Sequence, residues 1–283
     1  MTAPGCRRGL FAYGDVLTVG VAMSGHSFTF SHALCRAPST SVTDGLRAVD
    51  QGDPEPELFA REHAGYVTAL RATGAQVDVL PADERFPDSV FIEDAALVLK
   101  GTAIVLRPGA ESRLGEAEAL RPDLTRRMRG VDLQTSGFVD GGDILCSDTE
   151  VMVGLSARTT EQGAEDLRPI VEDLGYQLRI LRTPADILHF KTESSLLDET
   201  TILATPKLAA SGCFGAYTVI HTAEGEEAAA NAIRFNDTVF LSEGYPATAR
   251  NLREAGYTVT CLPTTQAALV DGGLSCMSLR YSV

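Results

Sequence analysis

Short runs in which apolar and polar residues alternate recur along the chain, and this alternation predicts β-strands with one buried face. The runs begin roughly 40 to 55 residues apart, within the range of periods at which repeat architectures are found. They cover residues 76–80, 131–135, 176–181, 217–221 and 257–262. A strand that returns at a near-constant interval predicts a fold built from five similar units.

The segments around each run repeat as well. Four of the five runs follow a segment with apolar residues at three- and four-residue spacing, which predicts helices over 58–70, 116–128, 165–174 and 247–255. The run at 217–221 lacks such a helix. Four pairs of β-rich runs about polar or glycine turns predict hairpins over 95–106, 143–155, 194–204 and 232–242.

The two ends of the chain complete each other in this scheme. The fifth unit stops after one strand-like run at 277–281, and the run at 28–34 supplies its missing strand. Five ββαβ-type units joined in this way predict a closed α/β propeller with pseudo-fivefold symmetry around a central channel, because closure removes exposed sheet edges. An ordinary doubly wound sheet, the alternative, explains neither the hairpins nor the regular spacing.

Composition narrows the class of partner. The 283 residues are 44% hydrophobic, which is enough apolar material for a large folded domain. Lys and Arg number 24 against 38 Asp and Glu, so the formal net charge is −14. A surface this acidic repels nucleic acids and anionic membranes and attracts small cations.

Cysteine, histidine and glycine patterns argue against metals and cofactors. The six cysteines are scattered singly, without the short spacings of zinc sites or disulfide scaffolds, and predict reduced thiols in a cytoplasmic protein. The five histidines show no zinc-binding spacing, and neither glycine-rich nucleotide motif is present. We therefore expect no metal and no cofactor, and chemistry carried by side chains alone.

The first residues resemble a leader only superficially. Arg7 and Arg8 precede a mostly apolar stretch at 9–23, but Asp15 interrupts it and no A-x-A cleavage pattern follows. No other segment approaches the roughly 18 uninterrupted apolar residues that a membrane span needs. We expect residues 1–22 to be a non-functional extension and residues 23–283 to form one domain.

Polar residues concentrate in the loops that lead into the hairpins. These loops, at 86–94, 139–143, 187–193 and 271–276, carry carboxylates, His189 and Cys276 at equivalent ends of their units. A cysteine nucleophile with a histidine acid and base needs such a set. The alternative for each residue is structural: buried free cysteines are usually inert, His189 could lie in the core, and Asp140 and Asp143 could be turn residues beside Gly141 and Gly142.

Five motifs then carry a family resemblance. They are FPDSVFIED at 86–94, RPGAESR at 107–113, GLSART at 154–159, LHFK at 188–191 and DGGLSCMSL at 271–279. In order and spacing, from about residue 32 to residue 279, the chain resembles the dimethylarginine dimethylaminohydrolase family of the guanidino-modifying pentein superfamily. The resemblance implies the pentein fold and hydrolysis of N-omega-methylated arginine, asymmetric dimethylarginine or monomethylarginine, to citrulline and dimethylamine or methylamine.

The resemblance also implies a role for individual residues. Cys276 is the nucleophile that forms a covalent thiouronium, His189 protonates the leaving amine and then activates water, and Asp140 orients His189. The other matched positions contact the substrate: Glu93 and Asp94 its guanidinium, Asp88, Arg113 and Arg158 its amino-acid end, the Val270 carbonyl its α-amine, and Leu46 in a mobile loop over the entrance. Arg113 and Arg158 are expected near the rim of the channel.

Two other functions compete with this one. An arginine deiminase or amidinotransferase of the same superfamily shares the site, but deiminases carry an extra helical insertion for which the unit spacing leaves no room. A non-catalytic pentein that acts as a binding module has no reason to hold Cys276, His189 and the carboxylates at the same ends of their units. The preference between monomethyl- and dimethylarginine stays open, as does assembly into a homo-oligomer.

Overall fold

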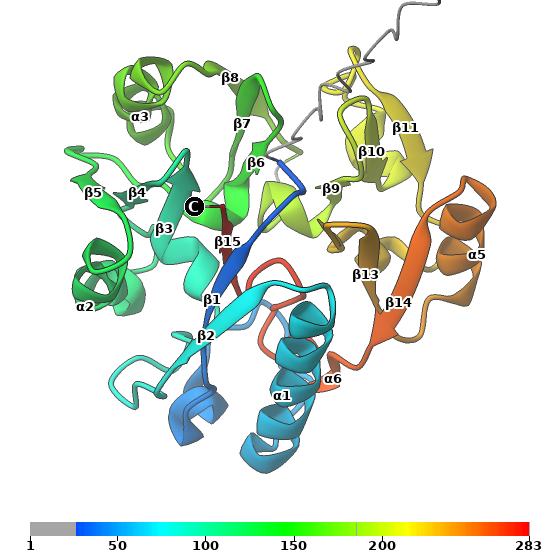
Figure 1. The fold of residues 1–283 in the computed structure, drawn as a ribbon, viewed down its shortest axis with the longest axis horizontal. Coiled ribbons are helices and arrows are strands. Elements are labelled where there is room, and N and C mark those ends of the chain that lie inside the picture. The colour runs from blue at the N-terminus through cyan, green and yellow to red at the C-terminus, as the bar shows by residue number, and fades with distance from the viewer. Residues whose placement is uncertain (1–26, 185, 283) are drawn as a thin grey trace, which may run out of the picture.

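The protein is a ring of five blades around a central axis (Figure 1). The computed structural model describes residues 27–184 and 186–282, and within these ranges the strands form five separate three-stranded sheets. Each sheet joins an antiparallel pair to a third strand that runs parallel to the middle one. The closed five-unit α/β propeller, predicted from the repeating strand pattern, is confirmed.

The five blades follow the chain in order. The blades are built from β3 (Ala96–Leu99), β4 (Thr102–Val105) and β5 (Arg129–Asp132); β6 (Ile144–Cys146), β7 (Glu150–Leu155) and β8 (Gln177–Arg182); β9 (Ser194–Leu196), β10 (Thr201–Ala204) and β11 (Thr218–His221); β12 (Ile233–Phe235), β13 (Thr238–Ser242) and β14 (Thr258–Leu262); and β15 (Leu279–Tyr281), β1 (His32–Arg36) and β2 (Gln76–Leu80). The predicted strands agree with these to within a few residues.

The last blade closes the ring with strands from both ends of the chain. β15 pairs antiparallel with β1, with Ala33 opposite Arg280, and β1 runs parallel to β2. The strand expected at 28–34 lies slightly later, because the backbone of Phe28 and Phe30 instead bonds Asn236 of the neighbouring blade, at 2.7 Å in each case. Pairing with β1 therefore ties the C-terminal strand β15 into the ring, and the contacts with Asn236 tie in the segment before β1.

Helices cover the outside of the ring (Figure 1). They are α1 (Pro56–Ala72), α2 (Leu114–Thr125), α3 (Glu161–Asp173), α4 (Pro206–Ala209), α5 (Pro246–Glu254) and α6 (Thr265–Ala268). On α1, Phe59, Tyr66 and Leu70 form the buried stripe expected of an amphipathic helix. Each such side chain contributes about 1.5–3 kcal/mol when fully buried. The unit predicted to lack a helix has only the single turn α4.

Short 3₁₀ helices lead into the inner strands, and several of them lie within the polar loops. They are η2 (Ile92–Ala95), η4 (Gly141–Asp143), η5 (Phe190–Thr192) and η6 (Glu227–Ala230), in addition to η1 (Thr40–Asp44) and η3 (Glu111–Arg113). Glycine lets η2 and η4 touch: a Cβ on Gly141 would lie 2.0 Å from the Glu93 carbonyl oxygen. Neighbouring blades therefore meet backbone against backbone where the polar loops converge.

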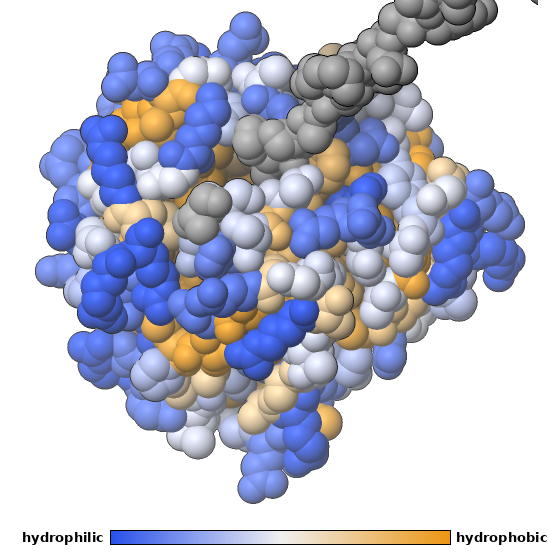
Figure 2. Space-filling view, in the orientation of Figure 1, coloured by the Kyte–Doolittle hydropathy of each residue, from blue (hydrophilic) through white to orange (hydrophobic). Residues whose placement is uncertain are grey.

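Hydrophilic side chains dominate the periphery of the face seen in Figure 2, with smaller apolar patches between them. In the described part of the chain, no helix has the length and apolar character that crossing a membrane requires. The predicted non-functional extension, residues 1–22, lies outside the described residues.

Candidate active site

A narrow cleft collects residues from three of the four polar loops, from the segment after η1, from η3 and from the loop after β7. Its lining residues are Leu46, Asp88, Phe91, Asp94, Arg113, Arg158, Leu188, His189, Val270, Asp271, Gly272 and Cys276. Eight of the ten predicted site residues are in this set. Asp140 lies beneath His189 without lining the cleft, and Glu93 lies elsewhere. The loops therefore converge as the sequence predicted, with differences in which side chains reach the cleft.

Hydrogen bonds from three elements hold the segment around Cys276. The Glu93 amide donates to the Cys276 carbonyl oxygen (3.1 Å), and the Tyr66 hydroxyl of α1 donates to the Leu274 carbonyl oxygen (3.1 Å). Arg280 donates to the Ser275 carbonyl oxygen (2.9 Å). Cys276 itself is 5% exposed. The sulfur is thus held by a rigid frame rather than on a free loop.

The surroundings of the Cys276 thiol disfavour its ionisation when the cleft holds no substrate. Burial raises the pKa of the thiol to about 11, and the carboxylates of Asp94 and Glu93 add to the rise. At neutral pH the free protein therefore holds Cys276 as the thiol. A cation placed beside the sulfur would reverse part of this effect, because it stabilises the thiolate.

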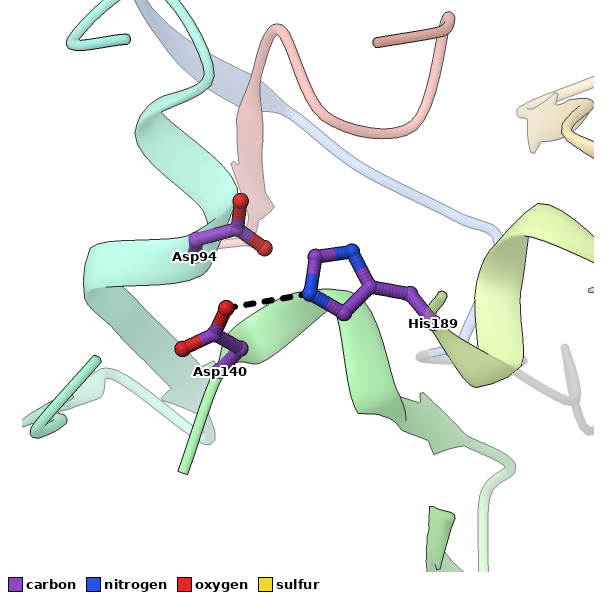
Figure 3. Close-up of side chains that lie close together, drawn as sticks. All are labelled: Asp94, Asp140 and His189. Atoms are coloured by element: carbon purple, nitrogen blue, oxygen red, sulfur yellow. Dashed lines mark hydrogen bonds and ion pairs between the residues drawn. The ribbon is translucent and has the colours of Figure 1, made fainter. Parts of the chain in front are cut away.

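His189 sits between two carboxylates. Its Nε2 lies 3.0 Å from Oδ2 of Asp140, and the carboxylate of Asp94 points toward the same imidazole ring (Figure 3). Burial alone would lower the pKa of His189, but Asp94, Asp140 and Asp143 outweigh it and raise the pKa to about 9. At neutral pH the ring is therefore protonated, and it is able to act as a proton donor.

The His189 ring fits against a glycine backbone. A Cβ on Gly142 would lie 2.7 Å from Nδ1 of His189, closer than side chains pack. Asp143 accepts from the Phe190 amide (2.9 Å) and from the Ser156 hydroxyl (2.6 Å). Asp143, which the sequence allowed to be a simple turn residue, is buried and ties η4 to the loop that carries His189.

The placement of Arg113 corrects the expectation that it stands near the rim. Its side chain is buried, forms an ion pair with Asp94, and donates to both oxygens of Glu116 at 3.1 Å. Although burial opposes ionisation of Asp94, Arg113 and His189 together lower the pKa of its carboxyl. Arg113 lines the cleft, but in this structure its guanidinium is engaged in keeping Asp94 charged.

Glu93 also departs from the expected arrangement. Asp94 faces the cleft, whereas Glu93 lines a separate cavity of about 430 Å³ bounded by the inner strands of the blades. There it pairs with Lys191 (2.7 Å) and with Arg280. Consecutive residues of a tight helix point in different directions, and here the two carboxylates face different cavities. Only the backbone amide of Glu93 serves the Cys276 segment.

The outer part of the cleft carries the groups expected to bind an amino acid. Arg158 is half-buried, and among the described residues its guanidinium has no ion-pair partner. The carboxylate of buried Asp88 accepts from the Leu46 amide (3.0 Å), which holds the loop after η1 against the cleft. Burial raises the pKa of the Asp88 carboxyl, an effect that Arg113 and the Leu46 amide oppose.

Asp94, Asp140 and His189 lie close enough together to ligate a metal ion, with ligand atoms within 4.8 Å of one another. Their oxygens are engaged otherwise: Asp94 binds Arg113 and the Gly142 amide, and Asp140 binds the Gly109 amide and His189. The geometry is that of a proton-transfer group rather than a metal centre.

Comparisons with known proteins agree with this geometry. A family model described as eukaryotic N,N-dimethylarginine dimethylhydrolase matches residues 35–191. The N(G),N(G)-dimethylarginine dimethylaminohydrolase of Pseudomonas aeruginosa is 36% identical over 254 residues, which cover 89% of this chain and all of the relative.

Two solved structures resemble the whole ring. One is the Pseudomonas aeruginosa dimethylarginine dimethylaminohydrolase, as a cysteine-to-serine variant complexed with citrulline; it is 36% identical with a TM-score of 0.87, and covers 90% of this chain and 100% of that chain. The other is a histidine-to-glycine variant of dimethylarginine dimethylaminohydrolase as an adduct with S-methyl-L-thiocitrulline, 35% identical with a TM-score of 0.86, which covers 89% of this chain and 100% of that chain.

Proposed function

Because the chain belongs to the dimethylarginine dimethylaminohydrolase family, we propose that it hydrolyses N-omega-methylated arginine to citrulline and dimethylamine or methylamine. The observation that carries the proposal is the meeting of Cys276, His189 and Asp94, from three different blades, in one cleft. A thiol, a protonated imidazole and a buried carboxylate are the groups that cleavage of a guanidinium carbon–nitrogen bond needs.

The first step forms a covalent intermediate. The cationic guanidinium, paired with Asp94, lowers the pKa of the Cys276 thiol, which releases its proton to solvent, and the thiolate attacks the guanidinium carbon. The carbon–nitrogen bond to the methylated nitrogen then breaks, and protonated His189 donates its proton to the departing amine. The product of this step is a thiouronium on Sγ, with neutral His189 beside it.

The second step releases citrulline. Neutral His189 takes a proton from water, the hydroxide attacks the thiouronium carbon, and the carbon–sulfur bond breaks to return the thiolate. The product hydroxyl then gives up its proton, which leaves neutral citrulline and restores the Cys276 thiol. Asp140 holds the ring throughout, because its carboxylate accepts from Nε2. The relative with histidine replaced by glycine forms an adduct with S-methyl-L-thiocitrulline. That adduct supports the same roles here, with Cys276 as the nucleophile and His189 as the base of the second step.

Recognition of the amino-acid end rests on the outer cleft. We assign the α-carboxylate to Arg158, whose planar guanidinium binds two oxygens at once, and the α-amine to Asp88 and the Val270 carbonyl. The free space in the cleft is only about 30 Å³, far below the several hundred that a ligand of this size needs. The loop carrying Leu46 therefore has to move outward before substrate enters.

The substrate is tested by measuring citrulline-type product from four candidates. We expect turnover with asymmetric dimethylarginine and monomethylarginine, and little with arginine or agmatine. Faster turnover of arginine than of either methylated form would instead identify a deiminase. No product from any of the four, with the protein folded, would leave the binding-module alternative.

Arg158 gives a prediction about specificity. Arg158→Lys is expected to raise KM for dimethylarginine by roughly 10- to 100-fold with little change in kcat, because lysine cannot reproduce a two-point contact worth about 1.5–3 kcal/mol. Arg158→Ala should also narrow the gap between dimethylarginine and agmatine, which has no α-carboxylate. Arg182→Lys is a matched control, since its side chain is 80% exposed. A wild-type enzyme that processes agmatine as well as dimethylarginine would contradict the assignment.

We also assign the protein to the cytoplasm. The five cysteines within the described residues are all free. Unpaired thiols, including a nucleophile that must stay reduced, suit a reducing compartment.

A further inference from the structure

Asn231 brings a polar side chain to Cys276 from the blade of β12, β13 and β14, which contributes none of the four polar loops. It follows η6 and precedes β12, and it is 7% exposed. Its side-chain Nδ2 lies 3.8 Å from Sγ of Cys276, within hydrogen-bonding range for sulfur. Neither the motifs nor the roles derived above use this residue.

The orientation of the Asn231 amide is set by its second contact. Its Oδ1 accepts from the Ser275 backbone amide at 3.0 Å. Only the oxygen of the side-chain amide can accept that proton, so the NH₂ group has to face the sulfur. The Asn231 side chain therefore contacts both the Ser275 backbone amide and Sγ of Cys276.

Glycine makes room for this contact. A Cβ on Gly273 would lie 2.5 Å from both the side-chain amide carbon and Nδ2 of Asn231. Gly273 thus lets the buried amide approach the Cys276 segment as closely as it does. This packing gives Asn231 little freedom to turn away from the sulfur.

We infer that Asn231 is a positioning residue that holds Sγ of Cys276 and stabilises its thiolate. The inference rests on the proposed function, because the proposed reaction requires Cys276 to react as a thiolate. A neutral donor suits this place, since Asp94 and Glu93 already oppose ionisation and a further carboxylate would add to them. The other charged groups around the sulfur are Asp88, Arg113, Arg158, His189, Asp271 and Arg280. The hydrogen bond from Asn231 acts to lower the pKa of the thiol.

Asn231→Asp is the sharpest test, because it keeps the shape and the acceptor for the Ser275 amide but replaces the donor by a negative oxygen. We expect alkylation of Cys276 by iodoacetamide at about pH 8, followed on the Cys276 peptide by mass spectrometry, to slow at least tenfold. A tenfold loss of thiolate corresponds to one pKa unit. With dimethylarginine, the acidic limb of the kcat profile should move to higher pH by at least one unit, with KM within threefold of wild type.

Two further variants make the outcome decisive. Asn231→Ala removes the donor without adding charge and should slow alkylation less than Asn231→Asp does. Asn251→Asp, on the exposed face of α5 in the same blade, makes the same chemical change away from the site and should leave both readouts unchanged.

Unchanged alkylation and an unmoved acidic limb in a folded Asn231→Asp protein would overturn the inference. If that variant does not fold, the same two readouts in Asn231→Ala decide. Alkylation needs no substrate, so it tests the contact independently of the reaction. Slower alkylation of the Asn231 variants, together with a wild-type protein that makes no citrulline, would uphold the contact and refute the proposed function.

Discussion

Replacing Cys276 with serine is expected to lower kcat for dimethylarginine by at least about 1,000-fold, because loss of a covalent nucleophile removes the whole reaction path. Serine keeps the shape, but its hydroxyl ionises far less readily than a thiol in the same buried place. The frame around residue 276 uses backbone groups of the segment, so the fold should be unaffected. The measurement is steady-state citrulline formation, with circular dichroism to confirm folding.

The matched control for this variant is Cys261→Ser, a half-buried cysteine of β14 that does not line the cleft. Its activity should stay within twofold of wild type. A Cys276→Ser enzyme that retained activity within tenfold of wild type would refute covalent catalysis by Cys276.

Removing the imidazole of His189 is expected to have the second largest effect. His189→Ala should lower kcat by roughly 10²–10⁴-fold, the usual contribution of a positioned acid and base, and added imidazole should restore part of the rate. In the wild type, kcat/KM, which reports the free enzyme, should fall as pH rises through about 9, because His189 then loses the proton it gives to the leaving amine. Steady-state kinetics with and without imidazole measure both effects.

His221→Ala is the control for His189→Ala, since His221 is exposed at the end of β11. It should neither lose activity nor respond to imidazole. A His189→Ala enzyme with a KM raised a hundredfold and an unchanged kcat would show that His189 binds substrate and does not transfer protons.

The fold was predictable because its signal is local and repeated. Alternating residues such as those at 76–80 mark one strand, and the interval to the next marks one blade. Ring closure followed from an unpaired run at each end of the chain, and β15 does pair with β1. The exact bounds of β1 were not predictable, because the Asn236 contact that delays its start comes from a distant part of the chain.

The candidate site was predictable only as far as residue identity determines position. The motifs place Cys276, His189 and Asp94 in the converging loops, and the structure brings them to one cleft. They do not say which way a side chain turns inside a 3₁₀ helix, so Glu93 was assigned beside Asp94 although it faces another cavity. Asn231 escaped notice because a lone asparagine carries no signal until the fold sets it beside a sulfur.

Intact-protein mass spectrometry of His189→Ala after mixing with excess asymmetric dimethylarginine and rapid acid quenching tests the account most directly. Without the base for the second step, the enzyme should accumulate one adduct whose mass equals the substrate less one molecule of dimethylamine. Peptide mapping should locate that adduct on Cys276, and it should be absent from a protein that also carries Cys276→Ser. An adduct on another residue, or citrulline formed at the wild-type rate with none detected, would contradict the account.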